Sequence, residues 1–259
     1  MDKKQVLAVD IGNTNICVGC FDEKEIYFTE RISTDMGKTE LEYAVLIKTI
    51  LELRSVAVDS VSGAIISSVV PPLTHIVKNA IRKVIKQEPM VVGAGIKTGL
   101  NILIDDPATL GADLVVDSVA ALGVYGAPNI VIDMGTATTV AAIDKDKNYI
   151  GGVIFPGVNV SLQSLVSGTA QLPGISLSTP KRYIGRNTGD AMKSGIIYGE
   201  ASRLDGMIDR FEEELGYKVT VIATGGLAGV IVPHCKHEII QDQDLMLKGL
   251  KIIYEKNAK

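Results

Sequence analysis

Two short segments of this chain each place an aspartate, a glycine and a threonine where an apolar strand would end. The first is V-D-I-G-N-T at 9–14 and the second is I-D-M-G-T-A at 132–137. An aspartate in such a turn can hold Mg²⁺ directly or through water. The glycine lets backbone N–H groups approach phosphate oxygens without a side chain in the way, and the hydroxyl is a neutral donor. Each segment therefore predicts a site for a nucleotide phosphate.

A simpler interpretation is that Gly12 and Gly135 only make hairpin turns, which are common after strands. It leaves unexplained why Asp10 and Asp133 end buried strands, where an unpaired charge is costly. The two copies lie about half the chain apart, and a T-G-G motif follows at 224–226. Together these features favour phosphate binding over a plain turn.

The elements around the two segments alternate between strand and helix patterns. We expect strands at 6–10, 16–21, 25–33, 61–67, 129–133, 138–144, 149–154 and 219–223. We expect helices at 39–53, 72–86, 110–125, 158–167, 188–215 and 245–254. Thr39 and Glu42 have the spacing of a capping box at the start of the first helix. The repeated pattern predicts a duplicated α/β domain with a cleft between the halves.

The composition limits the partners. The chain has 259 residues, 46% hydrophobic and 22% charged, with a net charge of −4. No basic field exists to attract nucleic acid or anionic lipid, so any phosphate must be held locally. The apolar stretches are too short to span a bilayer, and residues 1–5 have no targeting pattern. Three cysteines without framework spacing fit a reducing compartment, so we expect a cytoplasmic protein.

Longer motifs carry a resemblance to known families. D-I-G-N-T-N at 10–15, D-M-G-T-A-T-T at 133–139 and A-T-G-G at 223–226 resemble the nucleotide-binding elements of the actin-like ATPase and sugar-kinase superfamily. Four further motifs are similar in order and spacing to type III pantothenate kinases: G-A-D at 111–113, G-G-V-I-F-P-G at 151–157, T-A-Q-L-P at 169–173 and I-G-R-N-T-G-D-A-M-K-S-G at 184–195. The resemblance implies two ribonuclease-H-like (actin-like ATPase) domains, at 1–117 and 118–259, with the nucleotide in the cleft.

The same resemblance implies an activity and its residues. The reaction would be ATP-dependent phosphorylation of pantothenate to 4′-phosphopantothenate, the first step of coenzyme A synthesis, by a homodimer that uses Mg²⁺ and K⁺ or NH₄⁺. Asp113 would be the general base, Asp10 would lie near Mg²⁺ and Asp133 would bind the monovalent cation. The residues implied to bind ATP are Asp10, Ile11, Gly12, Asn13, Thr14, Asn15, Ile16, Cys17, Thr136, Gly225 and Gly226. Those implied on the pantothenate side are Gly111, Ala112, Asp113, Leu114 and Thr188.

Asp113 has two interpretations. As a helix cap it would lie at the start of the helix expected at 110–125, where aspartate is favoured. As a base it would accept the hydroxyl proton, a recurring role of aspartate in phosphoryl transfer. Gly111 and Ala112 leave room for a substrate. From the residues alone the cap is the better interpretation, and with the resemblance the base is.

The chain departs from the family pattern on the acid-binding side. Leu114 stands where an arginine is usual, Ile104 where a tyrosine is common, and Val140-Ala141 where Phe-Asp is common. Losing an arginine that binds a carboxylate removes charge-assisted hydrogen bonds of roughly 1.5–3 kcal/mol each. Lys181, Arg182 or Arg186 could take its place. Two alternatives stay open: a kinase for another small hydroxylated molecule, and a nucleotide-binding accessory protein with little turnover.

Two groups of metal-binding or redox residue types have ordinary explanations. Cys17 and Cys20 lie three residues apart on an expected strand and so point to opposite faces. The H-C-x-H group at 234–237 could bind zinc. It has no fourth ligand in sight, which favours a surface loop.

Overall fold

The computed structural model describes residues 5–258, which fall into two compact units. Unit 1 comprises residues up to 99, together with 108–123 and those from 244 onward, and unit 2 comprises 100–107 and 124–243. These bounds differ from the expected 1–117 and 118–259: the last helix and residues 118–123 group with unit 1, and residues 100–107 group with unit 2. Residues 1–4, on which part of the targeting argument rests, lie outside the described range.

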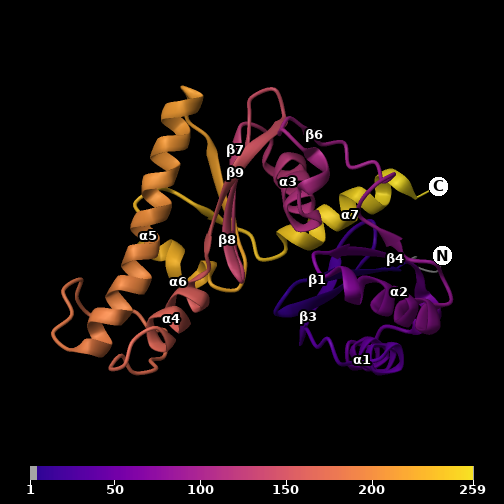
Figure 1. The fold of residues 1–259 in the computed structure, drawn as a ribbon. Coiled ribbons are helices and arrows are strands. Elements are labelled where there is room, and N and C mark those ends of the chain that lie inside the picture. The colour runs from indigo at the N-terminus through magenta and orange to yellow at the C-terminus, as the bar shows by residue number, and fades with distance from the viewer. Residues whose placement is uncertain (1–4, 259) are drawn as a thin grey trace. The chain divides into compact units, whose positions relative to one another are not determined.

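Unit 1 is built on a five-stranded sheet. Its strands are β1 (Gln5–Ile11), β2 (Asn15–Phe21), β3 (Ile26–Ser33), β4 (Val61–Ser68) and β5 (Met90–Val91), in the order β3-β2-β1-β4-β5. The central strand β1 runs antiparallel to β2 and parallel to β4 (Figure 1). The carboxyl ends of β1 and β4 therefore meet at one edge of the sheet.

Helices cover both faces of this sheet. The helices α1 (Glu40–Leu53) and α2 (Pro71–Ile85) pack together and share a buried aliphatic core with alternate residues of β1, β2 and β4. The predicted capping box at Thr39 and Glu42 is confirmed. The short helix η1 (Val58–Ser60) leads into β4.

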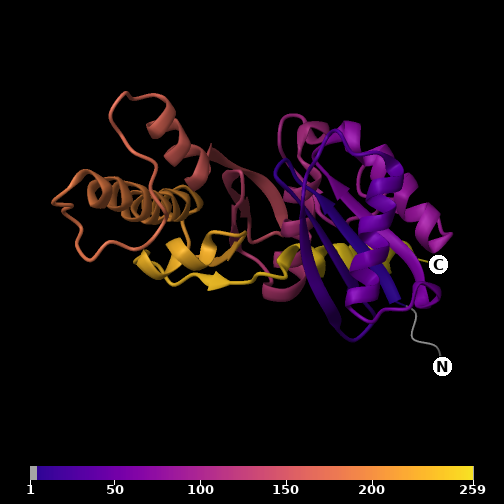
Figure 2. The ribbon, with the colours of Figure 1, turned by 90° about the horizontal axis from the view of Figure 1, so that it is seen from below.

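The other face of the unit 1 sheet contacts the last helix, α7 (Leu245–Asn257), shown in yellow against the indigo strands in Figure 2. Two glycines of the sheet make room for it: a Cβ on Gly19 would lie 2.6 Å from Leu247, and one on Gly63 would lie 2.0 Å from Tyr254. On its other side, α7 touches α3 (Ala112–Tyr125) so closely that a Cβ on Gly249 would lie 2.1 Å from a backbone oxygen of α3.

Unit 2 repeats the same plan. Its strands are β6 (Asn101–Ile102), β7 (Asn129–Met134), β8 (Ala137–Ile143), β9 (Asn148–Pro156), β10 (Thr220–Thr224) and β11 (Ile240–Gln241). The order β9-β8-β7-β10-β11 matches β3-β2-β1-β4-β5 strand for strand, with β6 added beside β9. The directions match too, since β7 is antiparallel to β8 and parallel to β10. The predicted duplication is confirmed.

The helices of unit 2 are α4 (Val158–Ser167), α5 (Thr188–Leu215) and α6 (Ala228–Ile231), with the short helix η3 (Val232–His234). The short helix η2 (Pro107–Thr109) lies where the chain passes from unit 2 to unit 1. The bounds of α4 and α5 are those expected from the sequence. Buried residues of α5 and α6 share a core with alternate residues of β7, β8 and β10. No helix in the described part of the chain combines the length and apolar character needed to cross a membrane.

Candidate active site

The first predicted phosphate loop is the turn between β1 and β2. The Gly12 N–H donates to the Asn15 carbonyl at 3.0 Å, which closes the turn. Thr34, just after β3, supports it twice: its N–H donates to the Thr14 carbonyl at 3.0 Å and its hydroxyl donates to the Gly12 carbonyl at 2.6 Å. The side chains of Asn13, Thr14 and Asn15 are exposed. Hydrogen bonds from Thr34 thus hold the turn in place (we call such a contact a brace), and the turn presents polar side chains to solvent.

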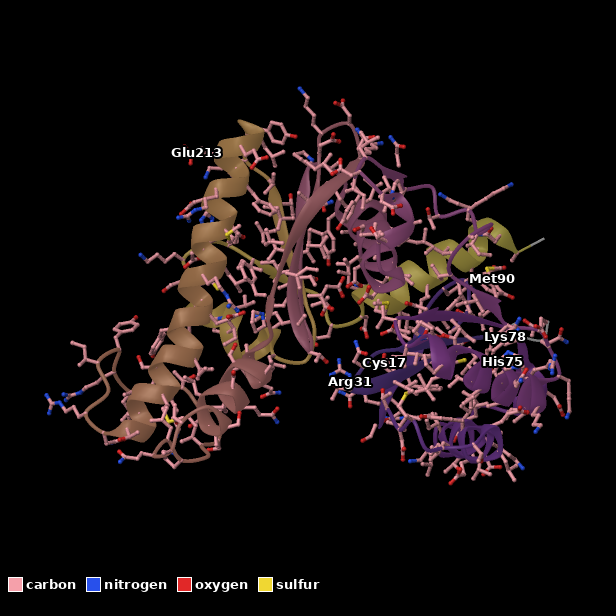
Figure 3. All side chains as sticks on the ribbon, in the orientation of Figure 1. Cys17, Arg31, His75, Lys78, Met90 and Glu213 are labelled. Carbon is pink, nitrogen blue, oxygen red and sulfur yellow. The ribbon has the colours of Figure 1, made fainter. Side chains whose placement is uncertain are left out.

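Asp10 lies in a row of polar side chains across the unit 1 sheet. Its register partners are Cys17 on β2 and Ser67 on β4, and Cys17 pairs in turn with Arg31 on β3 (Figure 3). Residues paired in this way share one face of a sheet. The Ser67 hydroxyl is buried and has no hydrogen-bond partner among the described residues. Arg31 and Ser67 were not predicted from the sequence, because only the strand register aligns them with Asp10.

The second predicted loop is the turn between β7 and β8. The Gly135 N–H donates to the Ala137 carbonyl at 3.0 Å, and the Gly157 N–H donates to the Thr136 carbonyl at 3.1 Å. A Cβ on Gly157 would lie 2.3 Å from the Thr136 oxygen. Gly157 follows β9 as Thr34 follows β3, so both loops are braced from equivalent positions. The exposed Thr136 side chain is then held at a fixed place on the sheet edge.

Asp133 lies in a second polar row, equivalent to that of Asp10. Its register partners are Thr139 on β8 and Thr224 on β10. The Thr139 hydroxyl is buried and has no hydrogen-bond partner among the described residues. Gly225 has a φ of +93°, and a Cβ there would lie 2.7 Å from an Asp133 carboxylate oxygen. The T-G-G turn therefore passes directly over the end of β7, and its next residue, Gly226, is exposed.

Asp113 lies at the same sheet edge as the first loop. The Val69 N–H donates to the Ile11 carbonyl at 3.0 Å, which joins the ends of β1 and β4. Gly111 lies against this point, since a Cβ on it would be 3.7 Å from Val69 and only 2.4 Å from an Asp113 carboxylate oxygen. The absence of a side chain at Gly111 is therefore what gives the Asp113 carboxylate its place.

Asp113 lies at the start of α3. The helix begins at Ala112, so Asp113 is in its first turn and is not the residue that precedes it. Its carboxylate accepts the Leu114 N–H at 2.8 Å. Burial raises the pKa of the Asp113 carboxyl above its usual value, and the hydrogen bond from the Leu114 N–H only partly opposes this. A raised pKa at a polar sheet edge is typical of a carboxylate used as a base.

The other residues predicted on the substrate side lie on α3 and near the start of α5. Leu114 is half-buried on α3 beside Asp113. Thr188 is exposed at the start of α5 in unit 2, roughly 18 Å along the helix from Glu200, which lies beneath the second loop. Lys181, Arg182 and Arg186 are exposed in the segment before α5.

The H-C-x-H group does not form one site. His234 contacts the Thr179 hydroxyl at 3.1 Å, and the Cys235 thiol faces the Ala201 carbonyl. His237 instead contacts the Asp209 carboxylate at 2.9 Å and has the Glu212 carboxylate nearby. The three side chains thus have different protein partners and do not converge on one point where zinc could bind. Cys17 and Cys20 form no disulfide and lie at different depths, as their strand spacing predicts.

Comparison with known proteins agrees with this geometry. The family model described as type III pantothenate kinase matches residues 6–210. A type III pantothenate kinase of Bacillus cytotoxicus is 44% identical over 253 residues, which cover 98% of this chain and 97% of that protein. The chain belongs to the type III pantothenate kinase family. Membership makes it an enzyme, a pantothenate kinase that acts in coenzyme A biosynthesis.

Solved structures confirm the fold of this pantothenate kinase. A Campylobacter jejuni protein assigned to the Baf family of transcriptional activators has a TM-score of 0.61 at 20% identity, covering 97% of this chain and 98% of that one. MreB 5 of Spiroplasma citri, solved with AMPPNP, has a TM-score of 0.55 at 11% identity, covering 98% and 96%. The predicted family, activity and duplicated ribonuclease-H-like fold are confirmed. The roles of individual residues stay predictions.

Proposed function

We propose that this pantothenate kinase transfers the γ-phosphoryl group of ATP to the primary hydroxyl of pantothenate, with Asp113 as the general base. One observation carries the proposal: the half-buried carboxylate of Asp113 lies against Gly111, which packs on Val69, and Val69 is hydrogen-bonded to Ile11 at the end of β1, where the first glycine turn begins. A base and a phosphate loop on one sheet edge are the two parts that an ATP-dependent kinase needs to have close together.

Asp113 is the group that takes the hydroxyl proton. Burial disfavours its charged form, so its proton affinity exceeds that of an exposed aspartate and suits proton transfer. In phosphoryl transfer the protein mainly positions the reactants and neutralises charge. The missing side chain at Gly111 makes room for the carboxylate near Val69, which follows β4, and the alcohol needs only to be oriented toward it.

The two loops bind the nucleotide. In the first loop, backbone N–H groups and the exposed Asn13 and Thr14 side chains contact phosphate oxygens. In the second loop, Thr136 does the same, and the T-G-G turn at Gly225 and Gly226 lies near the adenosine. The missing side chain at Gly225 lets the turn lie against the end of β7, and the exposed Gly226 leaves the backbone open to a flat ligand. The brace on each loop supports this role, because a preorganised donor loses little entropy on binding.

The residues present fit the cations that the family uses. Asp10 has the Ser67 hydroxyl beside it, and Asp133 has the Thr139 hydroxyl, both buried and without a protein partner among the described residues. Carboxylate and hydroxyl oxygens are the hard ligands that Mg²⁺ and K⁺ prefer. Asp10 would hold Mg²⁺ and Asp133 the K⁺ or NH₄⁺ ion. When bound, these ions neutralise charge on the phosphates.

The proposal extends to assembly and compartment. We place the enzyme in the cytoplasm as a homodimer, in line with the family resemblance. Cys17, Cys20 and Cys235 form no disulfide, which suits a reducing compartment. Light scattering on a size-exclusion column is expected to give twice the mass of one chain, and a mass of one chain would contradict the dimer.

The assay for the proposal compares wild type with Asp113→Asn in the presence of ATP, pantothenate, Mg²⁺ and K⁺. We expect Asp113→Asn to lower kcat by about 10²–10⁴-fold, the range for a lost general base. Asp59→Asn, which changes an exposed aspartate at the far end of β4, is the control and should retain full activity. Equal rates for wild type and Asp113→Asn would remove Asp113 from the mechanism.

Leu114 favours an alternative, in which the enzyme also phosphorylates another small hydroxylated molecule and prefers it to pantothenate. The apolar side chain next to Asp113 offers no charge to a substrate carboxylate. A panel of hydroxy acids and neutral alcohols, each assayed with ATP, tests whether such a substrate exists. A neutral alcohol phosphorylated with a higher kcat/KM than pantothenate would establish the second substrate.

A further inference from the structure

A charged pair on α5 lies directly beneath the second phosphate loop. Glu200 is only 6% exposed, and one of its carboxylate oxygens accepts the hydroxyl of Thr138 at 3.1 Å. Its other oxygen accepts the guanidinium of Arg203, one helical turn along. Thr138 is fully buried and is the first β8 residue to pair with β7 beyond the turn. Glu200 thus anchors the side of the loop that enters β8.

Arg203 reaches the other brace of the same loop. Its guanidinium donates to the Pro156 carbonyl at 3.3 Å and lies over the Phe155 ring, 4.4 Å from the ring centroid. Pro156 is followed by Gly157, whose N–H holds the Thr136 carbonyl. Contacts therefore run from Glu200 through Arg203 to Gly157 and end on the loop. The pair touches β8, which follows Thr136, and the end of β9, and it lies on the sheet face opposite Asp133.

Burying this ion pair costs desolvation free energy that a neutral contact at the same turn would not. Burial raises the pKa of the Glu200 carboxyl, although Arg203 and Thr138 oppose the shift. The Arg203 Nε is buried and has no hydrogen-bond partner among the described residues. Buried ion pairs often stabilise a fold no better than well-packed apolar residues of similar volume. Stability alone therefore gives little reason for charges at this place.

The equivalent helix braces the first loop with a neutral side chain, and the ion pair in that segment, between Asp35 and Lys38, is partly exposed. There the buried Tyr43 of α1 uses its hydroxyl to donate to the Asp35 carbonyl at 2.8 Å and to accept the Asp35 N–H at 3.1 Å. Asp35 follows Thr34, which holds the first loop. A neutral phenol thus does in unit 1 what a charged pair does in unit 2. The difference points to a requirement specific to the second loop.

We propose that Glu200 and Arg203 are positioning residues that fix the second phosphate loop in the conformation that receives ATP. The inference rests on the proposed nucleotide role of this loop. The two residues touch no substrate. They act through Thr138 and Gly157, so their loss weakens ATP binding and leaves pantothenate binding and the chemical step nearly unchanged.

The test is Glu200→Gln, which keeps the side-chain volume and a carbonyl acceptor for Thr138 but removes the charge that holds Arg203. The matched control is Glu212→Gln. Glu212 lies on the same helix, its side chain is 9% exposed, and it pairs with Lys218 far from the loop. We expect Glu200→Gln to raise the KM for ATP by about tenfold, the scale of one lost charged hydrogen bond, with kcat and the pantothenate KM within about twofold.

Three results would overturn the proposal. One is an ATP KM for Glu200→Gln within about twofold of wild type. Another is an equal rise in Glu200→Gln and Glu212→Gln, which would mean general destabilisation of α5. The third comes from the double variant Glu200→Met with Arg203→Met, expected to melt at or above the wild-type temperature and still bind ATP weakly. Wild-type ATP affinity in that variant would show that the charges are not needed.

Hydrogen exchange on the protein without nucleotide separates this inference from the proposed function. We expect amides in 133–140 to exchange faster in Glu200→Gln than in wild type or Glu212→Gln. If wild type fails to bind ATP, the proposed function fails, and faster exchange in Glu200→Gln would still support the brace. Unchanged exchange would overturn the brace even in an active enzyme.

Discussion

At the scale of single residues, the site depends on what glycines leave out and on what burial does to carboxylates. Gly111 gives Asp113 its space, and Gly225 lets the T-G-G turn cross the end of β7. Burial then shifts the proton affinity of the carboxylate that the chemistry would use. Glycines thus set where the carboxylates lie, and burial sets their pKa. Substitution of the glycines and a pH–rate profile measure these two effects separately.

The raised pKa of Asp113 predicts the acid limb of the pH–rate profile. A general base works only when deprotonated, and a raised pKa means that protonation sets in at a higher pH than for an ordinary aspartate. We expect kcat/KM to fall on acidification with a midpoint above 3.8, the ordinary value. Initial rates across the acid range check this, with circular dichroism confirming the fold at each pH. A midpoint at or below the ordinary value would contradict the assignment.

Gly225 and Gly216 form a matched pair of substitutions. Both have positive φ, +93° and +76°, but a Cβ on Gly225 would meet Asp133 at 2.7 Å, while one on Gly216 would meet nothing within 4 Å. Gly216→Ala should lose about 1 kcal/mol of unfolding free energy from backbone strain, and Gly225→Ala should lose more, because its Cβ would also meet the Met134 backbone nitrogen at 2.6 Å. Only Gly225→Ala should also lower activity, by more than about tenfold. Equal activity in the two variants would mean that the contact with Asp133 is unimportant.

At the scale of elements, strand register decides which side chains meet. The sequence pattern predicts β1, β2, β7 and β8 within one or two residues, and it predicts α4 and α5 at their observed ends. The two-residue strands β5, β6 and β11 and the short α6 were not predicted, since so few residues carry no periodicity. The polar rows of Asp10 and Asp133 follow from pairing between strands, which no single segment specifies.

Arg31 tests the first polar row. It shares a sheet face with Asp10 through Cys17, so its guanidinium is on the side where ATP phosphates would bind. We expect Arg31→Gln to raise the KM for ATP by about tenfold, the loss of one charged hydrogen bond. Arg54→Gln is the control, because Arg54 is a partly exposed arginine of the same unit paired with Glu30. Wild-type ATP affinity in Arg31→Gln would exclude this role.

At the scale of the whole molecule, the chain does not divide at its midpoint. The last helix returns to unit 1 and fills the face of the sheet that carries Asp10, where Gly19 and Gly63 leave room for it. The stability of the first half therefore depends on residues at the far end of the sequence. Such a long-range contact has a large loop-closure entropy and cannot be read from local periodicity.

Leu250→Ala is the corresponding prediction. Leu250 is fully buried on α7, and removing its side chain should lower the free energy of unfolding by about 2–5 kcal/mol. Hydrogen exchange should rise in β1 and β4 more than in β7 and β10, since α7 packs on the unit 1 sheet. Leu53→Ala, at an exposed leucine of α1, is the control and should be nearly neutral. An equal rise in both sheets would mean that the units unfold together.

The sequence by itself determined the strand and helix order, the two aspartate–glycine turns, the duplication and the family. These depend on local periodicity, turn residues and motifs, which are written in consecutive positions. Only the tertiary structure decided that Ser67 and Arg31 share the row of Asp10, that Thr139 lies beside Asp133, and that α7 belongs to unit 1. It also placed Glu200 and Arg203 beneath the second loop. The physical reason is that register and packing join residues distant in sequence, and burial changes their chemistry only once they meet.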